Sequence, residues 1–151
     1  LGPEAILEKN LTRIANGIAL DVALWDQLGC LSPIGVYFLS DDLDLADRLT
    51  NAIAQAMRKA EGEWPRGRIA SEIAAQIAQE RAEAEMRSAA NQPVHVHRSS
   101  GTSWTVIREE DATQRQNPLH RFLRVHPVRD IAQLQQTLLP IAPHLAAVAL
   151  D

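Results

Sequence analysis

The 151-residue sequence predicts an α/β fold in which helices flank a layered sheet. Some stretches carry apolar residues three and four positions apart, which is the period of an amphipathic helix. They alternate with short apolar runs rich in β-branched and aromatic residues, which is typical of strands. Elements that alternate in this way pack as layers. The hydrophobic fraction of 46% and charged fraction of 23% are ordinary for a globular chain, and the length allows one domain, residues 1–151, with a real core.

The first helix is expected from about Pro3 to Trp25, with a stripe of apolar residues at helical spacing along it. The stripe consists of Leu7, Leu11, Ile14, Ile18, Val22 and Trp25. The sequence GCLSP then breaks the period, and Pro33 disfavours helical geometry in Ser32. The apolar run at residues 34–39 predicts a strand that is buried on both faces.

A second helix is expected after Ser40, Asp41 and Asp42, since each of these residues can cap a helix. Its buried face would hold Leu45, Leu49, Ala52, Ile53, Ala56 and Met57. The segment GEWPRG, residues 62–67, is a linker. An alanine-rich helix at residues 69–90, less buried towards its end, should follow and stop at Asn91 and Pro93.

Three further strands are predicted by VHVH (94–97), SWTVIRE (103–109) and RFLRVHPV (121–128). The segment SSG is a turn between the first two, and the polar residues 110–120 form a loop before the third. Asp130 caps a last helix, whose inward residues would be Ile131, Leu134, Leu138 and Ile141. The segment HLAAVAL, residues 144–150, predicts a final buried strand.

Composition and charge exclude several classes of protein. The formal net charge of −4 argues against a nucleic-acid partner, which usually requires a basic surface. No apolar run approaches the ~20 residues of a membrane span, and the first ten residues do not have the pattern of a secretory signal. The single cysteine cannot form an internal disulfide, which suits a reducing compartment. We therefore expect a cytoplasmic protein.

That cysteine, Cys30, lies in WDQLGCLSP at a turn between a helix and a strand. Gly29 has no side chain to screen the sulfur, and amides after a tight turn can point at a developing oxyanion. Because a thiolate is a strong nucleophile, the position favours a nucleophilic cysteine. A buried structural cysteine is the alternative, since it can occupy the same turn. Asp26 and Gln27 are expected to support the loop by hydrogen bonds.

His95 and His97 alternate on a strand and therefore point to one face, but no third ligand is near in sequence. We expect solvent-facing histidines and no metal site. Arg121 and Arg124 alternate with apolar residues, which predicts an exposed basic edge. A contact of this edge with a phosphate group of a bound ligand is the alternative to a solvated strand face.

The stretch DVALWDQLGCLSP, residues 21–33, resembles the cysteine motif of fatty acyl-CoA reductases of the bacterial luminescence type. These enzymes belong to the aldehyde dehydrogenase superfamily. NPLHRFLRVHPV (117–128) is similar to a later family segment in which a proline–leucine pair precedes an arginine and a strand, and HLAAVAL to the segment that returns to the sheet. Gln27 stands three residues before Cys30 rather than two, which favours the acyl-CoA reductase branch over aldehyde-oxidising enzymes.

The resemblance implies the catalytic-domain fold of that superfamily and a reduction of long-chain acyl-CoA to fatty aldehyde. It implies that Cys30 attacks the thioester, that its own N–H helps to bind the oxyanion, and that NADPH supplies a hydride. His120 and Arg121 lie in a segment that resembles a cofactor-side loop, so the resemblance makes them possible cofactor or proton-transfer contacts. It also implies a homo-oligomer.

The sequence contains no G-x-G-x-x-G motif. In the superfamily, most of the cofactor-binding domain precedes the cysteine. We therefore expect the chain to be the C-terminal, catalytic-domain portion of a longer reductase, inactive as a reductase alone.

Two other functions stay open. The protein could transfer acyl groups through Cys30 without a redox step, in which case acyl-enzyme forms but no hydride is transferred. It could also be a non-catalytic oligomerisation or interaction module, in which case Cys30→Ala leaves the function intact.

Overall fold

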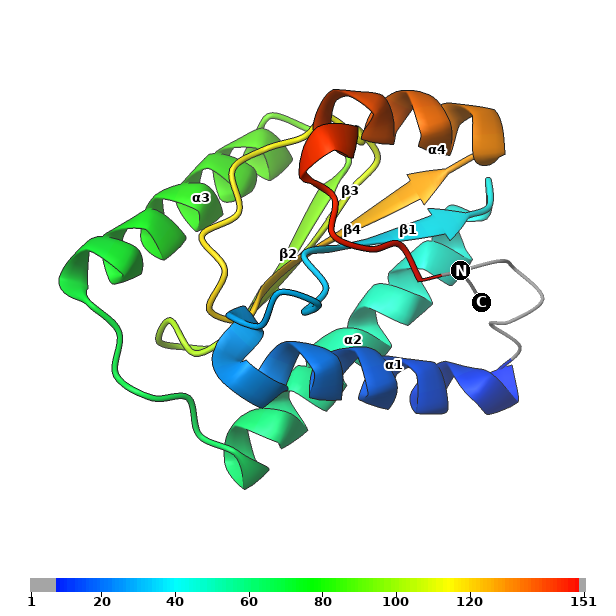
Figure 1. The fold of residues 1–151 in the computed structure, drawn as a ribbon. Helices are drawn as coiled ribbons and strands as arrows, with labels where there is room; N and C mark the ends of the chain where they lie inside the picture. Colours follow the sequence, from blue (N-terminus) through cyan, green and yellow to red (C-terminus); the bar gives the residue numbers. More distant parts are fainter. Residues whose placement is uncertain (1–7, 150–151) are drawn as a thin grey trace.

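The structure, a computed structural model, describes residues 8–149 and confirms the α/β class: helices cover both faces of a four-stranded mixed sheet (Figure 1). The elements in chain order are α1 (Glu8–Ala23), the 3-10 segment η1 (Leu24–Gln27), β1 (Gly35–Leu39), α2 (Leu43–Glu63), α3 (Ser71–Ala89), β2 (Val94–Arg98), β3 (Thr105–Glu109), β4 (Phe122–Val128), α4 (Ile131–Leu138) and the 3-10 segment η2 (Leu139–His144).

The strands are ordered β1-β4-β3-β2 across the sheet. β4 is central and runs parallel to both β1 and β3, whereas β2 pairs antiparallel with β3 through the hairpin that SSG predicted. Gly35 is opposite Arg124, and Thr105 is opposite Phe122. The amino ends of the three parallel strands therefore meet at one edge of the sheet. The segments that precede β1, β3 and β4 must lie close together there.

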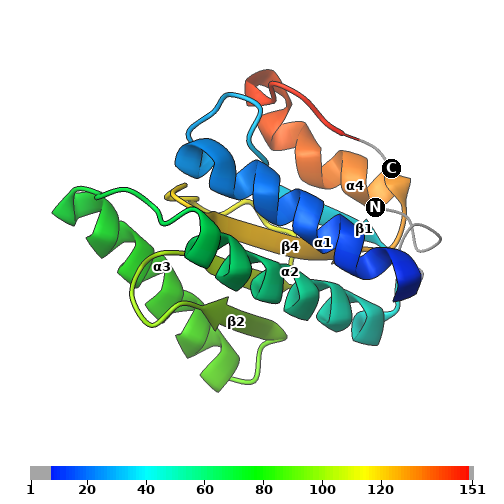
Figure 2. The same cartoon turned by 90° about the horizontal axis from the view of Figure 1, so that it is seen from below.

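One face of the sheet packs on α1 and α2, which lie side by side (Figure 2). Alternate residues of the strands face this core because successive strand side chains point to opposite faces. They are Val36, Phe38, Val106, Leu123 and Val125.

The opposite face is covered in two places. Ile77 and Ala84 of α3 pack on Ile107 and Phe122. Leu134 of α4 belongs to a smaller cluster with Val128, Ala112, Tyr37 and Leu39. These three clusters hold the sheet between helices, as a layered α/β fold requires.

The predicted helix boundaries are confirmed where local capping signals exist. The Asp42 carboxylate accepts from the Leu45 amide at 2.9 Å, and the Asp130 carboxylate from the Gln133 amide at 2.7 Å. Asn91, which follows the C-cap residue Ala90 of α3, has φ 59°, the left-handed conformation in which many helices terminate. Among the described residues, no helix combines the length and the apolar character needed to cross a membrane.

Several sequence predictions are wrong. β1 is not buried on both faces, because it is an edge strand: Val36 and Phe38 are buried while Tyr37 and Leu39 are half-buried. Ile131 is exposed rather than inward, since only the later turn of α4 reaches the sheet.

Another wrong prediction is the final strand. Residues 145–149 are irregular and Val148 is exposed; they follow η2, which contains Pro140 and Pro143, and pair with no strand. The predicted start of the first helix at Pro3, with Leu7, lies outside the described residues, as does Leu150.

Candidate functional site

Cys30 lies in the loop that joins η1 to β1, and its thiol is exposed to solvent. The Ser32 amide donates to the Gly29 carbonyl at 3.0 Å and closes a tight turn around Cys30 and Leu31. The loop stands at the amino end of β1. Ligand sites of open α/β sheets are usually at the carboxyl ends of the strands, so this position is uncommon for the fold class.

Gly29 allows its neighbours to approach the backbone beside the cysteine. A methyl group at this position would lie 3.1 Å from Ser32 Oγ and 3.9 Å from both Cβ and Cδ1 of Trp25. The indole of Trp25 therefore lies against the backbone one residue before Cys30. A side chain at this position would require the Ser32 hydroxyl to shift by a few tenths of an ångström.

Gln27 connects this loop to the centre of the sheet. Its side-chain amide donates to the Pro33 carbonyl at 2.7 Å and to the Phe122 carbonyl at 2.9 Å, and its oxygen accepts from the Phe122 amide at 2.8 Å. Gln27 is only 1% exposed. These are the contacts that a loop-supporting role requires. They fix both the start and the end of the cysteine loop, residues 28–34, relative to β4.

Asp26 provides a second connection. Its carboxylate accepts from Arg121 Nε at 2.7 Å and, at 3.4 Å, from the Gly67 amide in the linker between α2 and α3. Arg121 also donates to the Ala23 carbonyl at 3.2 Å, where α1 ends.

Arg121 and Arg124 do not form the predicted exposed basic edge, because both side chains are buried. Arg121 pairs with Asp26. Arg124 pairs with Glu80 of α3 and with Glu109, which is fully buried and also pairs with Arg87 and Arg115. The carboxylates that pair with these two arginines lie on other segments of the sequence. The alternating pattern of the strand therefore gave no indication of them.

Backbone strain is concentrated at the same place. Trp25, Asp26 and Gln27 have φ values of 64°, 51° and 64°, and Leu119, His120 and Arg121 have φ values of 60°, 55° and 70°. Left-handed geometry costs a non-glycine residue about 1–2 kcal/mol. The two segments, which we call the two left-handed turns, contact each other through the Asp26–Arg121 pair. Such clustering of strain is characteristic of functional sites.

Asn117 and Arg66 make further hydrogen bonds between these segments. The sequence analysis identified neither residue as part of the site. The Asn117 amide donates to the Ile34 carbonyl at 2.9 Å and to the Phe122 carbonyl at 3.1 Å. Arg66, in the linker, donates to the His120 carbonyl at 3.3 Å. An asparagine before a proline favours a turn, which was the available signal for Asn117; Arg66 gave no local signal.

His120 follows Leu119 in the second left-handed turn. Burial lowers the pKa of its imidazole, and the Arg66 guanidinium lowers it further, while Asp26 acts in the opposite direction. The ring is therefore neutral near pH 7, a state in which one ring nitrogen can accept a proton.

The two strand histidines lie away from this loop. His95 Nδ1 is 3.0 Å from a carboxylate oxygen of Asp47, and burial lowers the pKa of His97. Within residues 8–149, no three His, Cys, Asp or Glu side chains are grouped as metal ligands.

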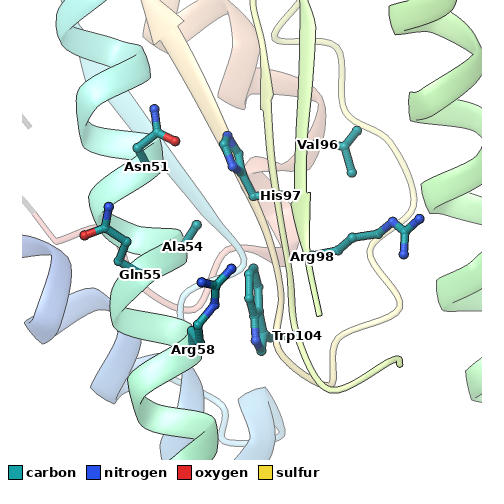
Figure 3. A pocket seen from close by; sticks show the side chains of 8 residues that line it. All are labelled: Asn51, Ala54, Gln55, Arg58, Val96, His97, Arg98 and Trp104. Atoms are coloured by element: carbon teal, nitrogen blue, oxygen red, sulfur yellow. The ribbon is translucent and has the colours of Figure 1, made fainter. Parts of the chain in front are cut away.

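His97 lines a shallow hollow between α2 and the hairpin of β2 and β3, shown with its eight lining residues in Figure 3. None of these residues belongs to the cysteine loop.

Large apolar side chains surround the cysteine in sequence and are exposed. Trp25 is 82% exposed, more than any other large apolar residue that the structure describes. The exposed apolar residues of this region are Leu20, Leu24, Trp25, Leu28, Leu31 and Ile34. Exposed apolar side chains that gather into one patch are typical of interaction sites.

Comparison with known proteins identifies the family. A protein-family model described as acyl-CoA reductase (LuxC) matches residues 1–151, the whole chain. No curated protein matches the chain. The match agrees with the resemblance carried by the cysteine motif. The chain therefore belongs to the acyl-CoA reductase (LuxC) family.

Proposed function

We propose that the protein reduces long-chain acyl-CoA to fatty aldehyde with NADPH, through a thioester on Cys30. Membership of the family gives the general activity, acyl-CoA reduction. The covalent mechanism, the chain length and the cofactor are the proposal. The observation that carries it is the placement of an exposed thiol in a turn whose backbone is fixed from both sides by Gln27.

In the first step the Cys30 thiolate adds to the thioester carbonyl. The carbon–sulfur bond to CoA then breaks, and CoA leaves as a thiolate. Because one thioester replaces another, the exchange is nearly balanced and requires no strong water-activating base. Backbone amides of the loop, that of Cys30 first, are suited to donate to the oxyanion.

In the second step the acyl-enzyme is reduced. When bound, NADPH would supply the hydride that reduces the thioester carbon, and with a proton from water this would leave a thiohemiacetal on Cys30. Breakage of its carbon–sulfur bond releases the aldehyde and frees the thiol. His120 is neutral near pH 7 and belongs to the turn that pairs with Asp26, which supports it as a candidate to accept the hydroxyl proton when the thiohemiacetal breaks down.

The residues around Cys30 do not themselves fit the phosphates of NADPH. Arg66 and Arg121 donate to acceptors of the chain, which are Thr102, the His120 carbonyl, Asp26 and the Ala23 carbonyl. Among the described residues no glycine has a positive φ, as a phosphate-cradling loop often requires. We therefore assign no phosphate contact to Arg121, and our proposal includes the upstream cofactor-binding domain that the resemblance implies.

Mass spectrometry tests the proposal directly. The full-length protein is incubated with acyl-CoA and no NADPH, digested and analysed. We expect a mass gain of one acyl chain on the peptide that carries Cys30, and no gain in Cys30→Ala. Addition of NADPH should then release aldehyde.

The alternatives give different results. Acyl-enzyme that transfers its chain but yields no aldehyde with NADPH would indicate acyl transfer without reduction. Full cellular function in Cys30→Ala would indicate an interaction module and contradict the proposal.

A further inference from the structure

The side chain of Trp25 is exposed although the periodicity of the sequence predicts that it faces the core. It continues the apolar stripe of Ile14, Ile18 and Val22, and Val22 is fully buried. The α-helix ends at Ala23, and Trp25 takes φ 64°. The left-handed turn thus places the indole outside the core.

This outward position is held by specific contacts. Asp26 and Gln27, the other two residues of the turn, make the hydrogen bonds to Arg121 and Phe122 described above. Trp25 therefore combines two unfavourable features, a strained backbone and an exposed indole. Strained geometry that the surroundings enforce indicates a function for the displaced group.

Trp25 lies against Gly29, the residue before the nucleophile that the proposed function requires. Its Cδ1 would be 3.9 Å from a Cβ atom on Gly29, the residue before Cys30. Leu28 is 58% exposed and Leu31 is 73% exposed, so apolar side chains flank the cysteine on both sides. An acyl chain bound to the sulfur starts at this point and must pass over neighbouring atoms.

We propose that Trp25, together with Leu28 and Leu31, forms the surface on which the acyl chain of the substrate lies. This inference rests on the proposed function, since it takes Cys30 as the attachment point. Contact with apolar side chains removes methylene groups from water, which favours long chains over short ones. Trp25 is thus a residue that determines chain-length specificity.

The test compares chain lengths in the full-length protein. The kcat/KM values for tetradecanoyl-CoA and butanoyl-CoA are measured in wild type, Trp25→Ala and Trp25→Phe. We expect Trp25→Ala to lower the ratio of the two values on the order of tenfold, mainly through KM for the long chain. Trp25→Phe, which keeps an aromatic surface, should retain most of the ratio. The matched control is Trp64→Ala, since Trp64 is 45% exposed at the end of α2, and its ratio should be that of wild type.

Fluorescence gives a second readout that does not depend on turnover. Acylation of Cys30 with a tetradecanoyl group should shift tryptophan emission to shorter wavelength, and Trp25→Phe should abolish the shift.

The outcomes separate this inference from the function on which it rests. Absence of acyl-Cys30 in wild type would overturn the proposed function itself. Normal acylation with an unchanged chain-length ratio in Trp25→Ala would overturn only the role of Trp25. An equal fall for both substrates, accompanied by a lower melting temperature or a higher KM for NADPH, would also overturn it, because Trp25 would then pack against another part of the polypeptide.

Discussion

Gln27 is the single side chain on which the shape of the cysteine loop depends most directly, because it bonds the Pro33 carbonyl and both polar groups of the Phe122 backbone. Gln27→Glu keeps the size but replaces the amide donor with a buried carboxylate and leaves two carbonyls without their donor. We predict a loss of about 2–4 kcal/mol in the free energy of unfolding and acylation of Cys30 slower by at least tenfold. Denaturant titration and rapid-quench mass spectrometry measure the two quantities.

The matched control for this substitution is Gln79→Glu, since Gln79 is exposed on α3. It should change neither the stability nor the acylation rate by much. Equal effects of the two substitutions would contradict a specific role for Gln27.

His126, on β4 and stacked on Tyr37, should make stability depend on pH. Burial is the main cause that lowers its pKa below 6.5; the Glu109 charge and backbone oppose it, and Arg124 and Arg115 add to it. The unfolded chain therefore binds more protons as the pH falls below 6.5. The contribution of His126 to the free energy of unfolding is fully present above the pKa that this histidine has in the unfolded chain. It is lost as the pH falls towards the lower pKa of the folded state.

We predict that His126→Gln reduces the loss of unfolding free energy between about pH 7.5 and pH 5.5, since one histidine contributes at most about 1.4 kcal/mol per pH unit. Urea titrations at several pH values measure the slope. His97 and His120 shift in the same direction, so the variant should keep part of the slope. An unchanged slope would show that His126 does not titrate in this range.

Residue-level roles were predictable where the partner of a side chain is close in sequence or where the motif itself is informative. Asp26 and Gln27 were expected to support the loop; Gln27 donates to the Pro33 carbonyl within it, whereas Asp26 accepts from Arg121 and Gly67 outside it. The exposure of Arg121 and Arg124 was predicted wrongly because their carboxylate partners, Asp26 and Glu109, lie on other elements. An alternating strand pattern cannot distinguish a solvated cation from a buried ion pair.

At the scale of elements, the two left-handed turns should act as one unit, because Asp26 on the first pairs with buried Arg121 on the second. Asp26→Asn leaves the Arg121 cation buried without a counter-charge, and we predict a loss of about 3 kcal/mol of stability. In a double-mutant cycle with Arg121→Gln, the coupling energy should be about 1.5–3 kcal/mol. Urea unfolding of the four proteins measures it.

A surface pair provides the comparison for this cycle. Arg98 and Glu85 connect β2 to α3 at 2.8 Å, but both side chains are more than 40% exposed, 43% and 46%. Their coupling should be about 0.5 kcal/mol or less. If the Asp26–Arg121 cycle gave a value this small, the two turns would not be energetically linked.

Elements with local signals were predictable and those set by tertiary contacts were not. Asp42, Asp130 and Asn91 marked helix ends correctly, because a cap depends on residues within one turn. Residues 145–149 have the composition of a strand but no strand partner in the structure. Strand propensity reflects packing against neighbours, so composition without a neighbour predicts poorly.

At the scale of the whole molecule, the candidate site is a product of strand direction. The cysteine loop, residues 28–34, and the second left-handed turn are 85 or more positions apart in the chain, yet each directly precedes a strand of the parallel β1–β4 pair. Parallel pairing brings these two amino ends together. The buried ion pairs of Glu109 with Arg115 and Arg124 then hold the helix-free crossing from β3 to β4 against the sheet. The alternation of helices and strands predicted the layers, but not which strands would be neighbours.

The apolar surface around Cys30 also predicts how the 151-residue chain behaves in solution. Trp25, Leu28 and Leu31 are exposed together, and the chain gains free energy by covering them. We therefore expect this polypeptide to form a dimer or larger species in sedimentation experiments at micromolar concentration. Leu31→Ser should shift the equilibrium towards monomer, because it removes apolar area from the surface that drives association. Met86→Ser on α3 removes a residue that is 66% exposed on a different element, and it should leave the equilibrium unchanged. A clean monomer for the unsubstituted chain, or the same shift in both variants, would show that this surface does not drive self-association.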